Sequence, residues 1–170
     1  MKKIGMIVLA AVLLTGCTSN VEKGISFLEE KQYKEAVAVF QEEIKDDKNL
    51  DEAYRGMAIA YYELKEYEKA AEAFAQAKEH GAEETAVFYS LWATCHLKQG
   101  AYEQAAYYYD QALNMEDCGA QLEQEIRFNK IAILEKQSNW EELKVQVEAY
   151  AKQYPEDTSI ERIAEFLETR

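Results

Sequence analysis

The residue types that most often carry out catalysis or bind metals are sparse in this sequence, and they are not arranged as known sites require. The chain has two histidines, His80 and His96, and three cysteines, but no cysteine pair at the spacing of a zinc site. It has neither a His-Glu-x-x-His motif nor a glycine-rich phosphate loop. Acid pairs such as Glu83-Glu84 fall at predicted helix ends, where carboxylates ordinarily face water or the helix dipole. We therefore expect no catalytic activity, no metal site and no cofactor.

The first 16 residues have the features of a signal peptide. Lys2 and Lys3 precede the apolar run Ile4–Leu14, which is too short to span a bilayer. The run ends in Leu-Thr-Gly-Cys, which resembles the lipobox of bacterial lipoprotein signal peptides. That resemblance implies cleavage before Cys17 and a diacylglyceryl group on its thiol, and two acyl chains anchor a protein stably. The alternative is an ordinary signal peptide with an incidental cysteine.

Composition favours a single helical domain with an acidic surface. Its 170 residues are typical of one domain, and one proline and seven glycines leave little room for long loops. With 19 basic and 32 acidic residues the formal net charge is −13, which becomes −15 when Lys2 and Lys3 leave with residues 1–16. Such a charge makes nucleic acid a poor partner and an anionic membrane surface a repulsive one. A basic protein partner is compatible with it.

The stretch Asp51–Glu84 has the pattern of two amphipathic helices joined by a tight turn, at about Glu52–Leu64 and Tyr67–His80. Within each helix, apolar residues recur at offsets of three and four, which place them on one stripe. The pattern recurs before and after this stretch with a shift of 34 or 35 residues, as three pairs show: Ala36 and Phe40, Ala70 and Phe74, and Ala105 and Tyr109. A helix pair with this period is typical of a stacked repeat array, so the sequence predicts an all-α fold.

The residues at the repeating positions resemble those of the tetratricopeptide repeat family. The second unit matches the family pattern at Tyr54, Met57, Ala58, Tyr61, Tyr67, Ala70, Phe74 and Ala77. The third unit matches at Tyr89, Trp92, Ala93, Tyr102, Ala105, Tyr109 and Ala112, and the first at Gly24, Tyr33, Ala36 and Phe40, with Glu43 where alanine is usual. The resemblance implies a domain over 17–170 of antiparallel helix pairs stacked as a right-handed solenoid. Its repeats would lie at about 17–50, 51–84, 86–119 and 124–157.

The fourth unit departs from this pattern. A longer joint, Asp117–Leu122, precedes it, and its predicted helices are about Gln121–Lys136 and Asn139–Gln153. In the second unit, small residues such as Ala58 and Ala70 let two backbones approach closely. The fourth unit has large residues at the corresponding positions, so we expect its two helices to be further apart: Ile131, Leu143 and Tyr150.

A last helix is expected at 159–169, where it would cover the open end of the array. The sequence Thr-Ser-Ile-Glu at 158–161 has the form of a capping box, which predicts the start of this helix. One side of the helix carries an apolar stripe: Ile160, Ile163, Ala164 and Leu167.

Structural roles account for the histidines and for the two other cysteines. His80 falls in the last turn of its helix, where the helix dipole favours a cation. His96 takes the position of Tyr61 in the preceding unit, so we expect a packed, half-buried imidazole. Cys95 falls inside a helix and Cys118 just after the next one, too far apart for a disulfide if the helices are antiparallel. We therefore expect two free thiols.

The family resemblance also implies a concave groove lined by the first helix of each unit. The positions that face the groove in the family fall here on Val21, Ile25, Leu28, Arg55, Ile59, Tyr62, Ser90, Thr94, Leu97 and Phe128. Relatives that clamp a peptide carboxylate use basic residues and asparagine there, whereas this chain has only Arg55, so that ligand is disfavoured. The wall is largely apolar, and exposed apolar surface marks interaction sites. An amphipathic helix or apolar peptide is the expected ligand.

Two alternatives for this wall stay open: coverage by the chain itself, and coverage by a second copy in a homodimer. The expected location is the outer face of a bacterial cytoplasmic membrane or the periplasmic side of an outer membrane, with the lipid on Cys17 as the anchor. Thr18 is not the aspartate that commonly retains such lipoproteins at the inner membrane. The sequence thus predicts a lipid-anchored scaffold for a protein or peptide partner, or a self-associating structural component.

Overall fold

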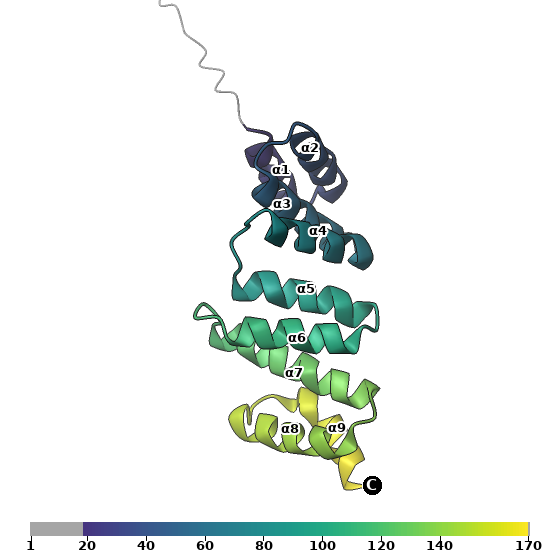
Figure 1. Cartoon of the computed structure of the whole chain (residues 1–170). Helices are drawn as coiled ribbons and strands as arrows, with labels where there is room; N and C mark the ends of the chain where they lie inside the picture. Colours follow the sequence, from purple (N-terminus) through teal and green to yellow (C-terminus); the bar gives the residue numbers. More distant parts are fainter. Residues whose placement is uncertain (1–18, 170) are drawn as a thin grey trace, which may run out of the picture.

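The computed structural model describes residues 19–169. Over this range the chain forms nine α-helices, a short 3₁₀ turn and no strand, which confirms the predicted all-α fold. The helices are arranged in pairs that stack into an elongated array, with α1 and α2 at one end and α8 and α9 at the other (Figure 1). Their bounds are α1 (Asn20–Glu29), α2 (Tyr33–Lys45), α3 (Leu50–Glu63), α4 (Tyr67–Glu79), α5 (Ala86–Lys98), α6 (Tyr102–Leu113), α7 (Ala120–Lys136), α8 (Trp140–Gln153), η1 (Thr158–Ile160) and α9 (Glu161–Glu168).

The predicted signal peptide at 1–16 and the predicted lipid attachment at Cys17 lie outside the described residues. Ser19 and Glu22 form a capping box at the start of α1. The Ser19 hydroxyl accepts from the Glu22 N–H, and the Glu22 carboxylate accepts from the Ser19 N–H. Of the helices described, none has both the length and the apolar character that crossing a membrane requires.

The two helices of each pair are joined by the same turn. In all four turns a backbone N–H donates to the carbonyl five residues earlier, from Gln32 to Phe27, Glu66 to Tyr61, Ala101 to His96 and Asn139 to Leu134. The residue before each donor has a positive φ, and only the third is a glycine: Lys31 (59°), Lys65 (62°), Gly100 (76°) and Ser138 (56°). The fourth unit therefore keeps the turn of the other three, although its packing differs.

Small residues lie where the helices of the regular pairs meet. Ala58 on α3 and Ala70 on α4 have no exposed surface and belong to one buried cluster. Glycines serve the same purpose around Phe40 of α2, which is fully buried against Gly24 of α1 and Gly56 of α3. A Cβ atom added at either glycine would lie within 2.5 Å of the Phe40 ring, so only glycine fits at both positions.

The fourth unit is filled by large side chains instead. Ile131 of α7 and both Leu143 and Tyr150 of α8 are buried together with Ile160 and Ile163 in a cluster at the C-terminal end. Helices α7 and α8 approach each other less closely along their length than α3 and α4 do, as the large residues predict. Helix α7 connects this cluster to the rest of the array. Its residues Ile126 and Ile133 pack into the buried cluster that contains Ala58 and Ala70, which we call the central cluster.

The apolar stripe of the last helix packs as predicted, but the capping box is wrong. Residues 158–160 form a 3₁₀ turn, and α9 begins only at Glu161, without a side-chain cap. The cap belongs to the turn and is supplied by Asp157, whose Oδ1 accepts from the Ser159 N–H at 2.9 Å. An aspartate is as good a cap as a serine or threonine, and this one lies before the motif that the sequence suggested.

Candidate functional site

Cys95, Cys118 and His96 are at least partly buried in the structure, whereas His80 is exposed. Within residues 19–169, no group of three or more His, Cys, Asp or Glu is placed to hold a metal ion. Cys95 and Cys118 are free thiols, as expected, and burial raises the pKa of Cys95 to about 12, which keeps that thiol protonated. His96 is half-buried, as expected, with its ring stacked on Tyr108 at 5.4 Å, and burial lowers its pKa. The candidate site is therefore defined by surface shape and polarity.

An apolar pocket of about 330 Å³ opens between helices α1, α3 and α5. It brings together four of the ten predicted groove residues: Ile25, Leu28, Arg55 and Ile59. The other lining residues are Glu52, Gly56, Phe74, Thr85, Val87, Phe88 and Leu91. Ile25 is 43% exposed and Val87 is 54% exposed, so aliphatic side chains stand open to water at its edge. We call this the apolar pocket.

Two of the predicted groove residues are buried. Val21 and Ser90 are each only 5% exposed, so neither presents its side chain to a groove, which corrects their expected position. Val21 lies in α1, which packs against both α2 and α3, and Ser90 lies in α5, which contacts α3, α4, α6 and α7. Helices enclosed on several sides leave few side chains at the surface, and a short side chain such as serine is the first to be covered.

The remaining predicted residues are half-buried and lie outside the apolar pocket. Thr94 uses its hydroxyl internally, at 2.9 Å from both the Ser90 carbonyl oxygen and the Tyr109 hydroxyl. Tyr62 packs edge-on against Tyr67 with ring centroids 6.0 Å apart, and Leu97 packs on the central cluster. Phe128 lies 6.0 Å from the Tyr150 ring and lines a different pocket. Their role in binding a partner stays a prediction.

The sequence reasoning missed the part of the pocket formed by α5. It assigned Ser90 and Thr94 to the wall, whereas the structure uses Val87 and Leu91, which are four residues apart and on one helical face. The signal was present in the composition of this helix, because α5 is apolar on nearly all sides. A helix of that kind has apolar residues both for the core and for an exposed site.

Polar contacts hold the start of α5, and thereby this wall of the pocket. Thr85 caps the helix by accepting from the Phe88 N–H at 3.1 Å, and both carboxylate oxygens of Asp117 accept from the Ala86 N–H, at 3.0 and 3.2 Å. Asp117 comes from the long joint between α6 and α7, 31 residues further along the chain. The joint that breaks the repeat spacing therefore caps the helix that forms the pocket wall.

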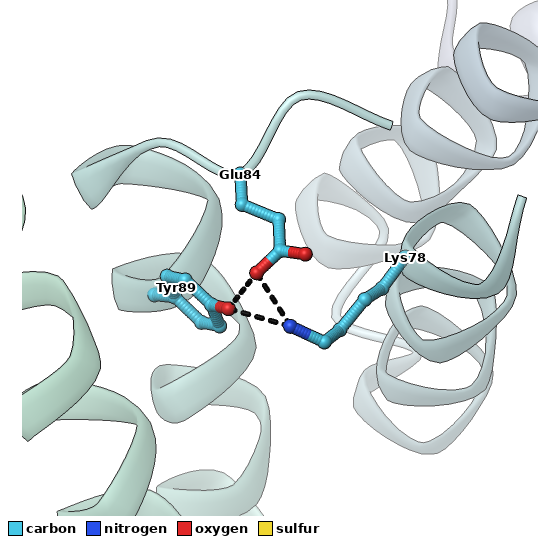
Figure 2. A network of polar contacts seen from close by, with 3 residues as sticks. All are labelled: Lys78, Glu84 and Tyr89. Carbon is cyan, nitrogen blue, oxygen red and sulfur yellow. Dashed lines mark hydrogen bonds and ion pairs between the residues drawn. The ribbon is translucent and has the colours of Figure 1, made fainter. Parts of the chain in front are cut away.

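A second group of contacts ties α5 to α4 (Figure 2). The Lys78 Nζ atom of α4 lies 2.5 Å from a Glu84 carboxylate oxygen and 2.7 Å from the Tyr89 hydroxyl of α5. The Tyr89 hydroxyl donates to the same Glu84 oxygen, and Lys78 also lies over the Tyr89 ring, 5.1 Å from its centroid. These bonds link the end of α4, the connecting loop and the first turn of α5.

Charged residues surround one side of the apolar pocket. Glu52 and Arg55 line the pocket itself, and a small adjoining hollow adds Asp51 and Glu83 beside them. Neither Glu52 nor Arg55 forms an ion pair with another residue in 19–169. The pocket thus offers an apolar floor with one guanidinium and several carboxylates at its rim.

A second pocket, of about 280 Å³, lies further along the array and has a different character. Helix α7, helix α8 and the turn before α9 form its walls, with Gln121, Gln124, Glu125, Phe128, Tyr150, Asp157 and Ser159. Gln124 Nε2 donates to Asp157 at 2.8 Å, and the Tyr150 hydroxyl donates to the same oxygen at 2.5 Å. Hydrogen bonds from Ser159, Tyr150 and Gln124 lower the pKa of the Asp157 carboxyl, so it is ionised at neutral pH. We call this the polar pocket.

Comparisons with known proteins agree with the repeat architecture. The tetratricopeptide repeat family matches residues 27–95, from the end of α1 into α5. The "TPR repeat-containing protein YsoA" of Bacillus subtilis (strain 168) is 48% identical over 50 residues, which are 29% of this chain and 15% of that protein. The chain therefore spans a small part of that relative's length.

Two solved structures share the fold. YrrB, described as a TPR protein with an unusual peptide-binding site, superposes with a TM-score of 0.67 at 20% identity, covering 80% of this chain and 68% of YrrB. MamA AMB-1 superposes with a TM-score of 0.68 at 14% identity, covering 87% of this chain and 84% of MamA. Arrays of this kind present extended surfaces for binding other proteins. Residues 27–95 thus match the tetratricopeptide repeat model, and the two solved structures share the helical-solenoid fold of the chain.

Proposed function

We propose that this protein is a scaffold that binds a segment of a partner protein in the apolar pocket, and that a lipid on Cys17 anchors it at the bacterial cell envelope. The observation that carries the binding role is the pocket between α1, α3 and α5, where aliphatic side chains from three helices stand open to water. Exposing apolar surface costs free energy in an unoccupied protein, so a contiguous patch of this kind marks an interaction site.

The ligand chemistry follows from the pocket's lining. Its volume of about 330 Å³ suits a few aliphatic or aromatic side chains, as an amphipathic helix or an apolar peptide would supply. Arg55 is the one basic residue among the lining residues, and carboxylates accompany it, so the pocket is poorly suited to a peptide carboxylate. The net charge of −13 disfavours nucleic acid as a partner.

Two valines provide a matched test of the binding role. Val87 lines the apolar pocket and is 54% exposed, whereas Val145 on α8 lies outside it and is 58% exposed. Random twelve-residue peptides displayed on phage are selected on the full chain, and the selected peptides are then measured against Val87→Asp and Val145→Asp. We expect loss of binding for Val87→Asp only, because burying an unpaired carboxylate against apolar side chains costs free energy.

Each other outcome of this test decides against the proposal. Equal binding to both variants would place the peptide site outside the apolar pocket. Light scattering addresses self-association: a dimer of the wild-type chain that Val87→Asp dissociates and Val145→Asp does not would make the pocket a homodimer interface instead.

The membrane anchor is tested separately. Cys17→Ala removes the thiol that the lipid would modify, and we expect the protein to move from the membrane fraction to the soluble fraction of bacterial cells. Metabolic labelling with a fatty acid should mark the wild-type chain and leave Cys17→Ala unlabelled. Tight membrane association of an unlabelled Cys17→Ala chain would argue against lipid anchoring.

A further inference from the structure

The small hollow beside the apolar pocket differs from it in charge. Its volume is about 80 Å³, and it is lined by Asp51, Glu52, Arg55, Ala82 and Glu83. Glu52 and Arg55 also line the apolar pocket, so the two cavities lie side by side on α3. We call the smaller cavity the acidic hollow. Because a water molecule takes up about 30 Å³ in the liquid, the acidic hollow has room for the charged end of one side chain.

Carboxylates outnumber cations in the acidic hollow. Three of its five lining residues are acidic, and Arg55 is the one basic residue among them. Glu52 and Glu83 are exposed, and Asp51 is half-buried. None of these three carboxylates forms an ion pair with any residue in 19–169. The acidic hollow therefore keeps an excess of negative charge next to an apolar cavity.

The lysines nearest to these residues in the sequence are held by other groups. Lys48 pairs with Asp46 at 3.3 Å. Lys78 pairs with Glu84 at 2.5 Å and lies 2.7 Å from the Tyr89 hydroxyl (Figure 2). Neither lysine supplies a cation to the acidic hollow, so a cation that balances its charge has to come from another molecule.

A basic side chain suits this place better than a metal ion does. Within the described part of the chain, no three acidic residues are placed to hold a metal ion together. An ammonium or guanidinium group needs only one or two carboxylates as acceptors. Lysine and arginine also have apolar stems that pack along apolar surface while the charge stays in water. A basic residue next to apolar side chains would thus match both cavities.

We propose that the segment bound in the apolar pocket carries a lysine or arginine at one end of its apolar cluster, and that this residue places its charge in the acidic hollow. The inference rests on the proposed function, because it specifies the partner of the same site. Apolar burial supplies most of the affinity. The charge fixes the direction of the segment, with its basic end at the start of α3 and its apolar part toward Ile59.

Helix α3 sets the spacing between the two parts of the segment. Glu52, Arg55 and Ile59 follow each other at offsets of three and four, so they lie on one face of the helix. At a rise of about 1.5 Å per residue, Glu52 and Ile59 are about 10 Å apart along the axis. A helical segment covers this length in two turns, and an extended one in about three residues. Twelve-residue peptides can present both parts in either form.

Peptides selected from the random twelve-residue library on the full chain test the role of the acidic hollow. We expect an apolar cluster with a lysine or arginine at its end. Binding of such a peptide should weaken about two- to fivefold for Glu83→Gln, as for one exposed ion pair, and the loss should shrink at high salt. Glu83 lines the acidic hollow but not the apolar pocket, so this change leaves the apolar lining intact. The matched control is Glu72→Gln, which removes the same charge from an exposed position of α4 that lines neither cavity.

Arg55 gives the test a sign. A selected peptide is compared with a version in which glutamine replaces its basic residue. Relative to that version, Arg55→Gln should favour the basic peptide, because it removes a like charge beside the acidic hollow. If the selected peptides instead carry an acidic residue and Arg55→Gln weakens their binding, the segment is acidic at this end, and the proposal is wrong while the proposed function stands.

A charge exchange makes the test specific to Glu83. Replacing the basic residue of the peptide with glutamate should weaken binding to the wild-type chain, and Glu83→Lys should restore it. If Glu83→Gln and Glu72→Gln bind the peptide equally while Val87→Asp does not bind it, the acidic hollow has no role and the proposed function stands. If Val87→Asp binds as well as the wild type, the apolar pocket itself is excluded and both proposals fail.

Discussion

The helix pair α3–α4 and the helix pair α7–α8 have the same turn but use their apolar residues differently. In α3–α4, alanines such as Ala58 and Ala70 occupy the crossing, and larger residues such as Ile59 remain at the surface of the apolar pocket. In α7–α8, the large residues Ile131 and Leu143 are buried between the helices. The pocket beside α7 is correspondingly lined mostly by polar residues.

The two pairs show that a repeat array can use its apolar residues either for packing between helices or for a binding surface. When small residues close the crossing, a helix needs little apolar volume inside and can present aliphatic side chains to a partner. When large residues fill the crossing, the same helix has its apolar side chains in the core and leaves polar groups outside. The comparison predicts that the two pairs are sensitive to opposite changes in side-chain volume. Smaller side chains should destabilise α7–α8, and larger side chains should destabilise α3–α4.

The largest effect is expected for Leu143→Ala in the C-terminal pair. Leu143 is fully buried, and its removal would leave a cavity between α7, α8 and α9, so we expect a loss of about 2–5 kcal/mol in the free energy of unfolding. Urea denaturation followed by circular dichroism measures it. A loss below about 1 kcal/mol would mean that this cluster collapses freely on truncation and does not depend on its large residues.

The opposite change, Ala70→Leu, should destabilise the α3–α4 pair. Extra methylene groups at the closest part of this crossing force side chains or backbones apart, with an expected loss of about 1–3 kcal/mol. The control is Ala149→Leu, the same substitution at an exposed position of α8, where we expect almost no change. Equal stability of the two variants in thermal or urea unfolding would show that the crossing of α3 and α4 accommodates the larger side chain.

A smaller effect is expected for Asp117→Ala, in the joint between α6 and α7. This change removes the acceptor of the Ala86 N–H at the start of α5, and the loss of a helix cap costs about 0.5–2 kcal/mol. Glu116→Ala removes the neighbouring carboxylate, which is exposed and does not cap this helix, and serves as the control. Amide hydrogen exchange should speed up most in the first turn of α5 for Asp117→Ala. Unchanged exchange there would show that Thr85 alone suffices as the cap.

The helices could be predicted from the sequence because their signals are local and repeated. Small and aromatic residues at fixed spacing place the helix pairs, and α4 begins at the predicted Tyr67 and ends at Glu79, one residue before the predicted His80. The cap from Asp117 to α5 could not be predicted in this way, because it joins residues 31 positions apart through a joint that breaks the repeat. The capping box at 158–161 failed for a different, local reason, since a competing cap, Asp157, stands just before it.

The groove residues were harder to predict, because their exposure depends on how far each helix is enclosed by its neighbours. Family positions placed Ile59 in the pocket, where α3 is open, and failed at Ser90, where α5 is covered on several sides. Of the residues that line the polar pocket, the family positions pointed only to Phe128, since Glu125 and Asp157 come together only after α8 and the turn before α9 have folded back.

The smallest expected effect concerns the turn that all four pairs share. Lys65 has a φ of 62°, a conformation that costs a residue with a Cβ about 1–2 kcal/mol, whereas Gly100 holds the same position in the next pair at 76°. Lys65→Gly should therefore stabilise the protein by about 0.5 kcal/mol, because the relief of strain exceeds the greater flexibility that glycine gives the unfolded chain. Gly100→Lys should destabilise it by a similar amount, since no atom lies within 4 Å of the added Cβ and only the backbone conformation is unfavourable. Thermal unfolding of the two variants measures both signs. If Lys65→Gly also destabilised the protein, the lysine side chain would have to contribute more in the turn than its backbone conformation costs.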